Sequence, residues 1–313
     1  MKSIYDTVVI GAGVTGLATA MYAGRLNFKT IVLGTTSGTE LPIGGTITLT
    51  DSVDNYPGFK HLTGQELAKK MEEHAKGYNV GIKEEKAVKI DKTENFVVKT
   101  EKSEYKTKTI IFATGTRWKE LQVKGAEEFK NKGLHYCALC DGALFKDKMI
   151  AVVGGSDTAA KEALLLAQYG KKVYIIYRRE KIRAEPINAK LIEKNPKIEI
   201  IPNTNIVEIK GDKRVTSVIL DKEYNGGKEL KLDGVFSAIG HMPLSELAVA
   251  LGVKVNDKKE IMIDRNSKTN VNGVFAAGDV TDSGFKQAIT GVAEGVIAAH
   301  SAYNYAKESE KSA

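Results

Sequence analysis

The chain has 313 residues, of which 42% are hydrophobic and 27% charged, a composition typical of a globular protein with about two domains. It contains no uninterrupted apolar run of the ~18 residues that a membrane span requires, and its N-terminal apolar run is too short for a signal peptide, so we expect a cytoplasmic protein with no membrane partner. The net charge of +7 comes from scattered lysines rather than a basic cluster with interleaved aromatics, which argues against a nucleic-acid partner.

The first element in chain order is a strand, a glycine-rich turn and a helix. Residues 5–10 are apolar and β-branched, 17–23 suit a helix, and 29–33 suit a second strand. Gly11, Gly13 and Gly16 lie between the first strand and the helix, in the arrangement that cradles a dinucleotide diphosphate at a helix N-terminus. The acidic residue that usually binds the ribose is missing, because the strand continues into Gly34-Thr-Thr36 and Glu40 comes too late.

The only two cysteines, Cys137 and Cys140, are three positions apart. A disulfide that closes so short a loop restrains the unfolded chain little, so a stabilising role is unconvincing. Structural zinc usually needs four ligands, and His135 could supply at best a third, so no metal site is expected. The spacing favours a redox-active pair in a reducing compartment.

A second strand, turn and helix follow the cysteines. Residues 149–153 and 173–177 suit strands, 160–167 suit a helix, and Gly170 lies where a C-terminal cap would. Gly154, Gly155 and Ser156 form the turn, so a serine replaces the second glycine of the fingerprint. Its side chain restricts how closely the backbone meets a phosphate, although its hydroxyl could donate a hydrogen bond.

The end of this second module indicates which nicotinamide cofactor binds. Arg178 and Arg179 follow the strand where an acid would select NAD, and Arg183 comes four residues later. Guanidinium groups match phosphate oxygens, and a 2′-phosphate distinguishes NADP from NAD. The sequence therefore predicts NADPH.

Two apolar runs closed by glycine, at 109–115 and 234–240, suggest where the chain crosses between the modules. We expect the second module to be inserted into the first, which resumes near residue 245. The expected fold class is α/β, with two Rossmann-like dinucleotide-binding domains of which the first is discontinuous.

Across essentially its whole length the chain resembles the low-molecular-weight thioredoxin reductases. The motifs that carry the resemblance agree with that family in order and spacing. They are Gly11-Ala-Gly-Val-Thr-Gly16, Asp54-Asn-Tyr-Pro-Gly58, Ala113-Thr-Gly115, Cys137-Ala-Leu-Cys-Asp-Gly142, Gly154-Gly-Ser-Asp-Thr-Ala159, Arg178-Arg-Glu-Lys-Ile-Arg183, Ile239-Gly-His241 and Gly273-Val-Phe-Ala-Ala-Gly-Asp279. The resemblance implies an FAD-binding domain of residues 1–115 and 245–313 and an NADPH-binding domain of residues 116–244 that carries the cysteines.

The resemblance also implies cofactor contacts, position by position. Thr46 departs from the family, which has glutamine there, and Lys286-Gln-Ala288 should begin a helix near the flavin ring. The implied FAD contacts are Gly11, Gly13, Thr15, Gly16, Gly44, Gly45, Thr46, Asn55, Thr114, Gly115, Gly278, Asp279, Lys286, Gln287 and Ala288. The implied NADPH contacts are Gly154, Gly155, Ser156, Asp157, Thr158, Arg178, Arg179 and Arg183.

By the same resemblance, a hydride passes from NADPH to FAD and then to the Cys137–Cys140 disulfide, after rotation of the domains. Cys140 would face the flavin, Cys137 would attack the disulfide of thioredoxin or a glutaredoxin-like protein, and Asp141 would be the acid and base. Members of the family are usually homodimers.

Two alternatives stay open. Ser156 and the missing ribose-binding acid leave room for NADH, ferredoxin or a deazaflavin as electron donor on the same fold. A non-catalytic flavin-binding sensor, whose disulfide switches a partner interaction, would have the same motifs.

Overall fold

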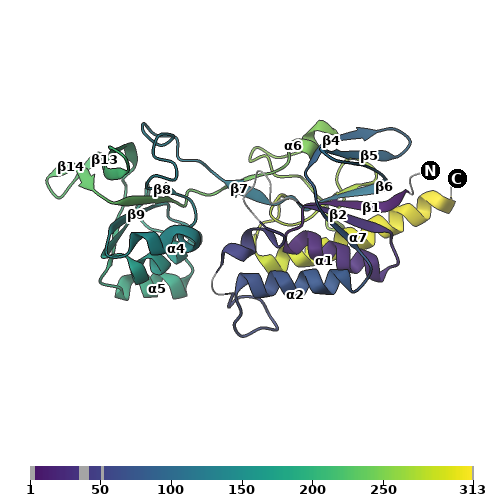
Figure 1. The fold of residues 1–313 in the computed structure, drawn as a ribbon, viewed down its shortest axis with the longest axis horizontal. Coiled ribbons are helices and arrows are strands. Elements are labelled where there is room, and N and C mark those ends of the chain that lie inside the picture. Colours follow the sequence, from purple (N-terminus) through teal and green to yellow (C-terminus); the bar gives the residue numbers. More distant parts are fainter. Residues whose placement is uncertain (1–3, 35–41, 51–52, 312–313) are drawn as a thin grey trace. The chain divides into compact units, whose positions relative to one another are not determined.

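The structure is a computed structural model that describes residues 4–34, 42–50 and 53–311, and it divides into two compact units. Unit 1 comprises Met1–Arg117 and Met242–Ala313, and unit 2 comprises Trp118–His241 (Figure 1). Unit 2 is therefore inserted into unit 1. These limits lie within three residues of the boundaries expected at 115/116 and 244/245.

Unit 1 contains a seven-stranded sheet in the order β3-β2-β1-β6-β5-β4, with β17 also paired to β6. Ile10 pairs with Leu33 and with Phe112, so the parallel strands β1, β2 and β6 end at one edge, where β17 ends as well. The strands are Tyr5–Ile10 (β1), Thr30–Gly34 (β2), Gly81–Glu84 (β3), Ala87–Lys92 (β4), Phe96–Thr100 (β5), Glu104–Phe112 (β6) and Val274–Ala276 (β17).

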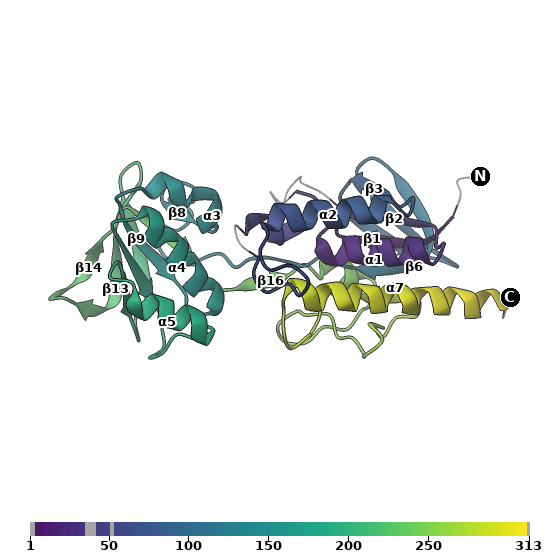
Figure 2. The same cartoon turned by 90° about the horizontal axis from the view of Figure 1, so that it is seen from below.

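Three long helices pack in unit 1, with α1 (Val14–Arg25) between α2 (Gly64–Lys76) and α7 (Ala288–Lys311) (Figure 2). A Cβ at Gly291 or Gly295 of α7 would lie 2.5 or 2.6 Å from a threonine hydroxyl of α1, so these glycines permit the close approach of the two helices. The shorter helices of unit 1 are η1 (Gly45–Leu49) and α6 (Glu246–Ala250).

Unit 2 contains a five-stranded parallel sheet in the order β11-β10-β9-β15-β8. Ile150 and Val152 of β9 pack on the helices, whereas Ala151 and Val153 pack on a three-stranded antiparallel sheet, because successive strand residues face opposite sides. The parallel strands are Leu134–His135 (β8), Met149–Val153 (β9), Lys172–Ile176 (β10), Ile198–Ile201 (β11) and Gly234–Ser237 (β15). The helices are Ala138–Asp141 (α3), Gly142–Phe145 (η2), Asp157–Tyr169 (α4) and Pro186–Lys194 (α5), and the antiparallel strands are Ile206–Gly211 (β12), Val215–Tyr224 (β13) and Gly227–Lys231 (β14).

The chain passes between the units through two short strands that pair with each other, β7 (Thr116–Trp118) and β16 (His241–Pro243). The runs expected to extend to 115 and 240 stop earlier as strands, at Phe112 and Ser237. Gly115 and Gly240 have φ of +64° and +111°, which is incompatible with an extended strand.

The other expectations about secondary structure are confirmed. Both strand–turn–helix–strand modules form within three residues of their expected limits, α4 has Gly170 at its C-cap, and α7 begins at Ala288. The mixed α/β architecture with two Rossmann-like sheets is also confirmed. Within the described residues, no helix has the length and apolar character needed to cross a bilayer.

Candidate active site

The glycine turn of unit 1 lies at the edge where the parallel strands end. Gly11 has φ of +111°, and a Cβ there would lie 2.2 Å from the Ala113 carbonyl oxygen, while a Cβ at Gly16 would lie 1.9 Å from the Gly11 carbonyl oxygen. A Cβ at Gly13, in contrast, would meet nothing closer than 3.7 Å. The fold itself therefore needs the first and third glycines, whereas the bare backbone at Gly13 leaves room for a diphosphate at the N-terminus of α1, as FAD requires.

Several other predicted FAD contacts gather around this turn. The Gly44 amide donates to the Ala12 carbonyl (2.8 Å), the Val14 amide donates to the Gly44 carbonyl (3.2 Å), and Gly45 follows with φ of +71°. Thr46 is exposed at the start of η1. The turn after β2 cannot be followed further, because Thr35, Thr36 and Glu40 lie outside the described residues.

Two predicted FAD contacts that are 232 positions apart in sequence are hydrogen-bonded to each other. The Asn55 side-chain amide donates to Oε1 of Gln287 at 2.9 Å, just before α7 begins. On the other side of the turn, a Cβ at Gly278 would lie 2.6 Å from Oγ1 of Thr15, so the Gly278-Asp279 segment packs closely on α1. Thr114 and Gly115 bond to the returning chain at Leu244.

The Lys286 side chain, a predicted flavin contact, is bonded to three protein groups. Its ammonium donates to the carbonyl oxygens of Asp279 (2.9 Å) and Thr281 (2.5 Å) and forms an ion pair with Glu260 (2.9 Å). Burial disfavours the ionised Glu260, but hydrogen bonds from Asn256 and Lys286 outweigh it and lower the pKa of its carboxyl. Lys286 thus stabilises the loop that contains Asp279 and Thr281.

Sequence reasoning missed two acids that shape this region, Glu260 and Glu294. Glu294 accepts a hydrogen bond from the Gly278 amide at 2.8 Å. The sequence did offer a signal for Glu294, because it is a charged residue between Gly291 and Gly295 on the helix face that contacts α1. Glu260 lies in a loop without any periodic pattern, and nothing in the sequence marked it.

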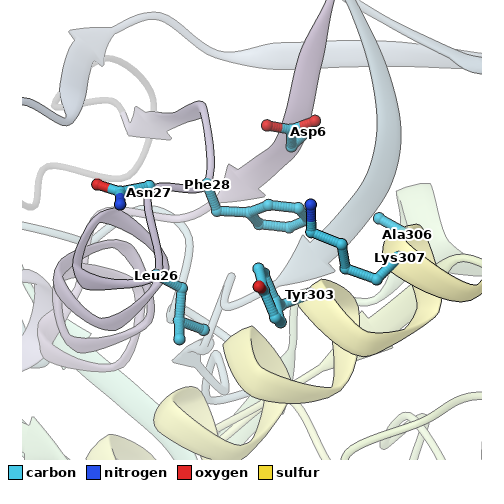
Figure 3. A pocket seen from close by; sticks show the side chains of 7 residues that line it. All are labelled: Asp6, Leu26, Asn27, Phe28, Tyr303, Ala306 and Lys307. Carbon is cyan, nitrogen blue, oxygen red and sulfur yellow. The ribbon is translucent and has the colours of Figure 1, made fainter. Parts of the chain in front are cut away.

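A pocket of unit 1 lies away from this turn (Figure 3). It lies between the start of β1, at Asp6, and α7, near Lys307. These are the amino ends of the parallel strands, whereas dinucleotides bind beyond the carboxyl ends. This pocket is therefore not the predicted cofactor site. Its lining residues are Asp6, Leu26, Asn27, Phe28, Tyr303, Ala306 and Lys307.

The second turn, in unit 2, keeps the first fingerprint glycine but has Ser156 and Ala159 where the first turn has Gly13 and Gly16. Gly154 has φ of +147°, and a Cβ there would lie 2.3 Å from the Ala238 carbonyl oxygen. A Cβ at Gly155 would lie 2.5 Å from three atoms of the Tyr177 ring, so this ring covers the turn. Ser156 is the N-cap of α4, and its Oγ accepts a hydrogen bond from the Ala159 amide at 3.4 Å. As an acceptor, Ser156 keeps its own hydroxyl proton available for an anionic oxygen.

The three predicted phosphate-binding arginines lie beside this turn. The Arg183 amide donates to the Gly155 carbonyl at 2.6 Å, which places residue 183 next to Ser156. Arg178, Arg179 and Arg183 are exposed, and their guanidinium groups make no hydrogen bond or ion pair with any residue that the structure describes. Their charges are thus available to an anionic ligand.

Asp157 and Thr158, predicted with the arginines, differ in their surroundings. Asp157 accepts 2.8 Å hydrogen bonds from the Glu185 amide and the Asn188 side chain, and it pairs with Lys161 at 2.9 Å. Burial raises the pKa of Asp157, but these partners outweigh it and lower the value. Asp157 therefore anchors the start of α5, whereas Thr158 is exposed in the first turn of α4.

Cys137 and Cys140 form a disulfide with their Cα atoms 5.4 Å apart. Cys140 is exposed, and its backbone amide donates to the sulfur of Cys137 at 3.1 Å. An amide that donates to sulfur favours the thiolate once the bond is reduced. The pair follows β8 directly, so the strand and α3 fix its position within unit 2.

Asp141 comes directly after Cys140 and is held by a residue that the sequence had suggested only as a possible metal ligand. Nδ1 of His135 lies 2.7 Å from Oδ2 of Asp141. The His135 side chain is 8% exposed, compared with 33% for Asp141. The three-dimensional arrangement therefore joins a buried imidazole, a half-buried carboxyl and a redox disulfide.

The chain resembles known proteins over nearly its whole length. The family model described as pyridine nucleotide-disulphide oxidoreductase matches residues 5–295. The curated thioredoxin reductase of Peptoclostridium acidaminophilum is 39% identical over 97% of this chain and 98% of its own length, and that of Bacillus subtilis is 39% identical over 98% and 96%. The crystal structure of Lactococcus lactis thioredoxin reductase matches with a TM-score of 0.91 and 37% identity, covering 97% of this chain and 99% of the other.

Both the glycine turns and the cysteine pair thus lie within the matched region. The chain belongs to the pyridine nucleotide-disulphide oxidoreductase family and, within it, to the low-molecular-weight thioredoxin reductases, flavoenzymes whose cofactors are FAD and NADPH.

Proposed function

We propose that this chain reduces the disulfide of thioredoxin, or of a similar small dithiol protein, with electrons from NADPH. The observation that carries the proposal is the composition of unit 2. It holds the Cys137–Cys140 disulfide with Cys140 exposed, the adjacent acid Asp141, and a dinucleotide turn with three arginines that have no partner among the described residues. The names of two curated relatives, both thioredoxin reductases, support the choice of partner.

The choice of NADPH over NADH rests on Arg178, Arg179 and Arg183. Three exposed guanidinium groups, none with a partner among the residues described, repel one another, and a 2′-phosphate would relieve that repulsion while accepting their hydrogen bonds. Each charge-assisted hydrogen bond contributes about 1.5–3 kcal/mol, which corresponds to tenfold or more in affinity.

We assign the FAD site to unit 1, around the turn of Gly11, Gly13 and Gly16. Bound FAD supplies two-electron chemistry between the nicotinamide and the disulfide. The residues of this chain bind and orient it. The helix N-terminus at Gly13 would hold the diphosphate, Asp279 would bind the ribitol, and the Asn55–Gln287 pair would contact the ring.

The thiol chemistry can be written for the chain's own residues. In the reduced state the Cys137 thiolate attacks one sulfur of the partner's disulfide, forming a mixed disulfide and breaking the partner's S–S bond. The sulfur that leaves takes a proton from Asp141, which then removes the proton of Cys140. The Cys140 thiolate attacks Cys137, the Cys137–Cys140 bond forms again, and the partner's second sulfur leaves and is protonated through Asp141. The enzyme dithiol is oxidised, and the partner is reduced by two electrons and two protons.

The test is spectroscopic. NADPH should bleach the flavin absorbance of the holoenzyme and oxidised thioredoxin should restore it, with repeated turnover. Cys137→Ser should retain bleaching and lose thioredoxin reduction. A flavin that NADPH leaves oxidised would contradict the donor, and full turnover by Cys137→Ser would contradict the thiol mechanism.

A different donor is the second candidate, and it has one specific observation in its favour. Ser156 replaces the second glycine, and the Tyr177 ring covers Gly155, so the second turn is more enclosed than the first. Bleaching by NADH, reduced ferredoxin or a reduced deazaflavin, but not by NADPH, would select this alternative. A single reduction without turnover would instead select a redox sensor.

We further propose a homodimer that acts in the cytoplasm, where a cysteine pair of this kind is kept available for catalysis rather than locked as a structural bond. Light scattering of the holoenzyme at micromolar concentration would detect a mass of twice 34.0 kDa. A monomeric mass would contradict the dimer and leave the reaction untouched.

A further inference from the structure

The buried His135 contacts Asp141, the proposed proton donor of the thiol reaction, and the mechanism above gives His135 no role. His135 is the last residue of β8, two positions before Cys137, and its Nδ1 lies 2.7 Å from Oδ2 of Asp141. The side chain is 8% exposed, so the solvent does not compete strongly for this hydrogen bond.

The imidazole is held rigidly by aromatic rings. It stacks on Phe236 with centroids 5.5 Å apart and an interplanar angle of 27°, and Phe145 meets it edge-on at 5.3 Å. Phe145 and Phe236 also meet each other edge-on at 5.2 Å. His135 and Phe236 are register partners in β8 and β15, so the parallel sheet fixes the backbone beneath the stack. The orientation of Nδ1 is therefore set before any substrate arrives.

This arrangement leaves the two oxygens of Asp141 with different roles. In the His135 tautomer that is protonated at Nδ1, Oδ2 accepts the hydrogen bond from the ring, and Oδ1 is the oxygen left to carry the proton. We propose that His135 is a positioning residue that orients the Asp141 carboxyl for proton transfer to the departing sulfur. The inference rests on the proposed function, because it refines the step in which Asp141 acts.

The step to which His135 contributes is limited to the departure of a sulfur that needs a proton. When the partner's S–S bond breaks, the proton passes from Asp141 to the leaving sulfur, and the resulting carboxylate keeps the His135 N–H at Oδ2. A disulfide whose thiolate leaves without a proton, such as an aromatic disulfide, makes no use of this transfer. Comparing the two substrate classes therefore distinguishes a loss of Asp141 positioning, which affects only the first class, from a general loss of enzyme activity, which affects both.

The experiment compares His135→Leu and His135→Asn in the holoenzyme. Leucine fills the space between the aromatic rings but cannot donate a hydrogen bond to Asp141. In asparagine the amide nitrogen is bonded to Cγ, as Nδ1 is in histidine, so it can donate from a similar position. We expect His135→Leu to reduce kcat with oxidised thioredoxin about tenfold and with an aromatic disulfide less than about twofold. His135→Asn should recover most of the loss, and flavin bleaching by NADPH should be unchanged in both variants.

Asp141→Asn supplies the matched comparison. It should show the same preference for the aromatic disulfide, with a larger loss on thioredoxin, and adding His135→Leu to it should cost nothing further, since the two residues act as a unit. Equal losses on both substrates, a full additional loss in the double variant, or no loss at all would overturn the role of His135. A wild-type protein unable to reduce thioredoxin would instead overturn the proposed function, so the two failures are distinguishable.

Discussion

The two glycine turns of this protein share the first fingerprint glycine and differ at the second and third fingerprint positions. In unit 1 a Cβ at Gly11 would meet the Ala113 carbonyl at 2.2 Å, and in unit 2 a Cβ at Gly154 would meet the Ala238 carbonyl at 2.3 Å. The second fingerprint position is Gly13 in unit 1, with nothing within 3.7 Å, and Ser156 in unit 2, with its side chain bonded to α4.

The difference shows which fingerprint glycine is required by the packing of the fold and which would be required only by a bound ligand. The first glycine is packed against the neighbouring parallel strand in both units, so the fold fixes it. The second position faces open space in unit 1, so only a ligand can require glycine there. Unit 2 has a serine and three arginines at this edge, and these arginines have no partner in the part of the chain that the structure describes. Its affinity for phosphate would depend more on side chains than on bare backbone.

We expect the greatest change in stability when the first fingerprint glycine of unit 1 is replaced by alanine, and a change in FAD affinity when the second is replaced. Gly11→Ala should lower the free energy of unfolding by about 3 kcal/mol or more, because φ is +111° and the new Cβ meets a backbone carbonyl. Gly13→Ala should leave the flavin-free protein within about 0.5 kcal/mol of the wild type and weaken FAD binding at least tenfold. Urea unfolding and flavin titration measure the two effects. Similar destabilisation by both substitutions would erase the distinction.

The arginines of unit 2 provide the second test. Arg179→Gln should raise the KM for NADPH between about tenfold and a hundredfold and leave the KM for NADH nearly unchanged, because only NADPH has the 2′-phosphate. Arg214→Gln, an exposed arginine of unit 2 outside the turn, is the control. If Arg179→Gln weakened NADH equally, the arginines would act on the shared diphosphate instead.

The two units also contain carboxyls with opposite pKa shifts. Burial raises the pKa of Glu162 in α4 to about 8, and its Oε2 has no hydrogen-bond partner among the described residues, whereas Glu260 has its pKa lowered by its partners, against the effect of burial. Ionising Glu162 therefore costs stability as the pH rises from its unfolded value of 4.5 towards 8, so Glu162→Gln should stabilise the protein by about 1 kcal/mol or more at pH 8 and little at pH 4.5.

Glu260→Gln should have the opposite effect on stability, lowering the free energy of unfolding at neutral pH. The ionised carboxylate stabilises the folded state above the unfolded pKa of 4.5, so the variant should lose stability at pH 7, and the loss should shrink as the pH falls through the lowered folded pKa. Thermal midpoints of both variants between pH 4 and 8 check the signs. Parallel pH profiles for the two variants would contradict the opposite shifts.

The last and least disruptive substitution is at the second fingerprint position of unit 2. Ser156→Gly restores the fingerprint and should cost only a few tenths of a kcal/mol, since glycine is an acceptable N-cap. We expect the KM for NADPH to change less than about threefold, because the Ser156 hydroxyl and a bare backbone both serve a phosphate oxygen. A large gain in NADPH affinity would show that Ser156 had been selected for another donor.

Local features of the chain were predictable because their causes are local. The β-branched run at residues 5–10, the glycines at 11 and 16 and the helical stretch after them specify a strand, a turn and a helix through side-chain sterics alone. The Cys137–Cys140 spacing likewise made the redox pair recognisable without any contact information.

Contacts between distant segments were not predictable. Lys286 was singled out as a flavin contact, but its bonds to Glu260 and the Asp279 loop were not foreseen, because the fold brings a buried acid there that the sequence pattern does not mark. Asn55 and Gln287 were each singled out, but their hydrogen bond depends on how the ends of β1, β6 and β17 are brought to one edge.

Periodicity and residue type act over a few positions, so the sequence was enough to predict two dinucleotide modules, the inserted order of the chain, the cysteine pair and the cluster of arginines after the second module. The contact of His135 with Asp141 and the position of residue 183 beside Ser156 came from the three-dimensional structure. Those contacts follow from strand order and packing, which depend on the free energy of the whole fold rather than on the preferences of any one segment.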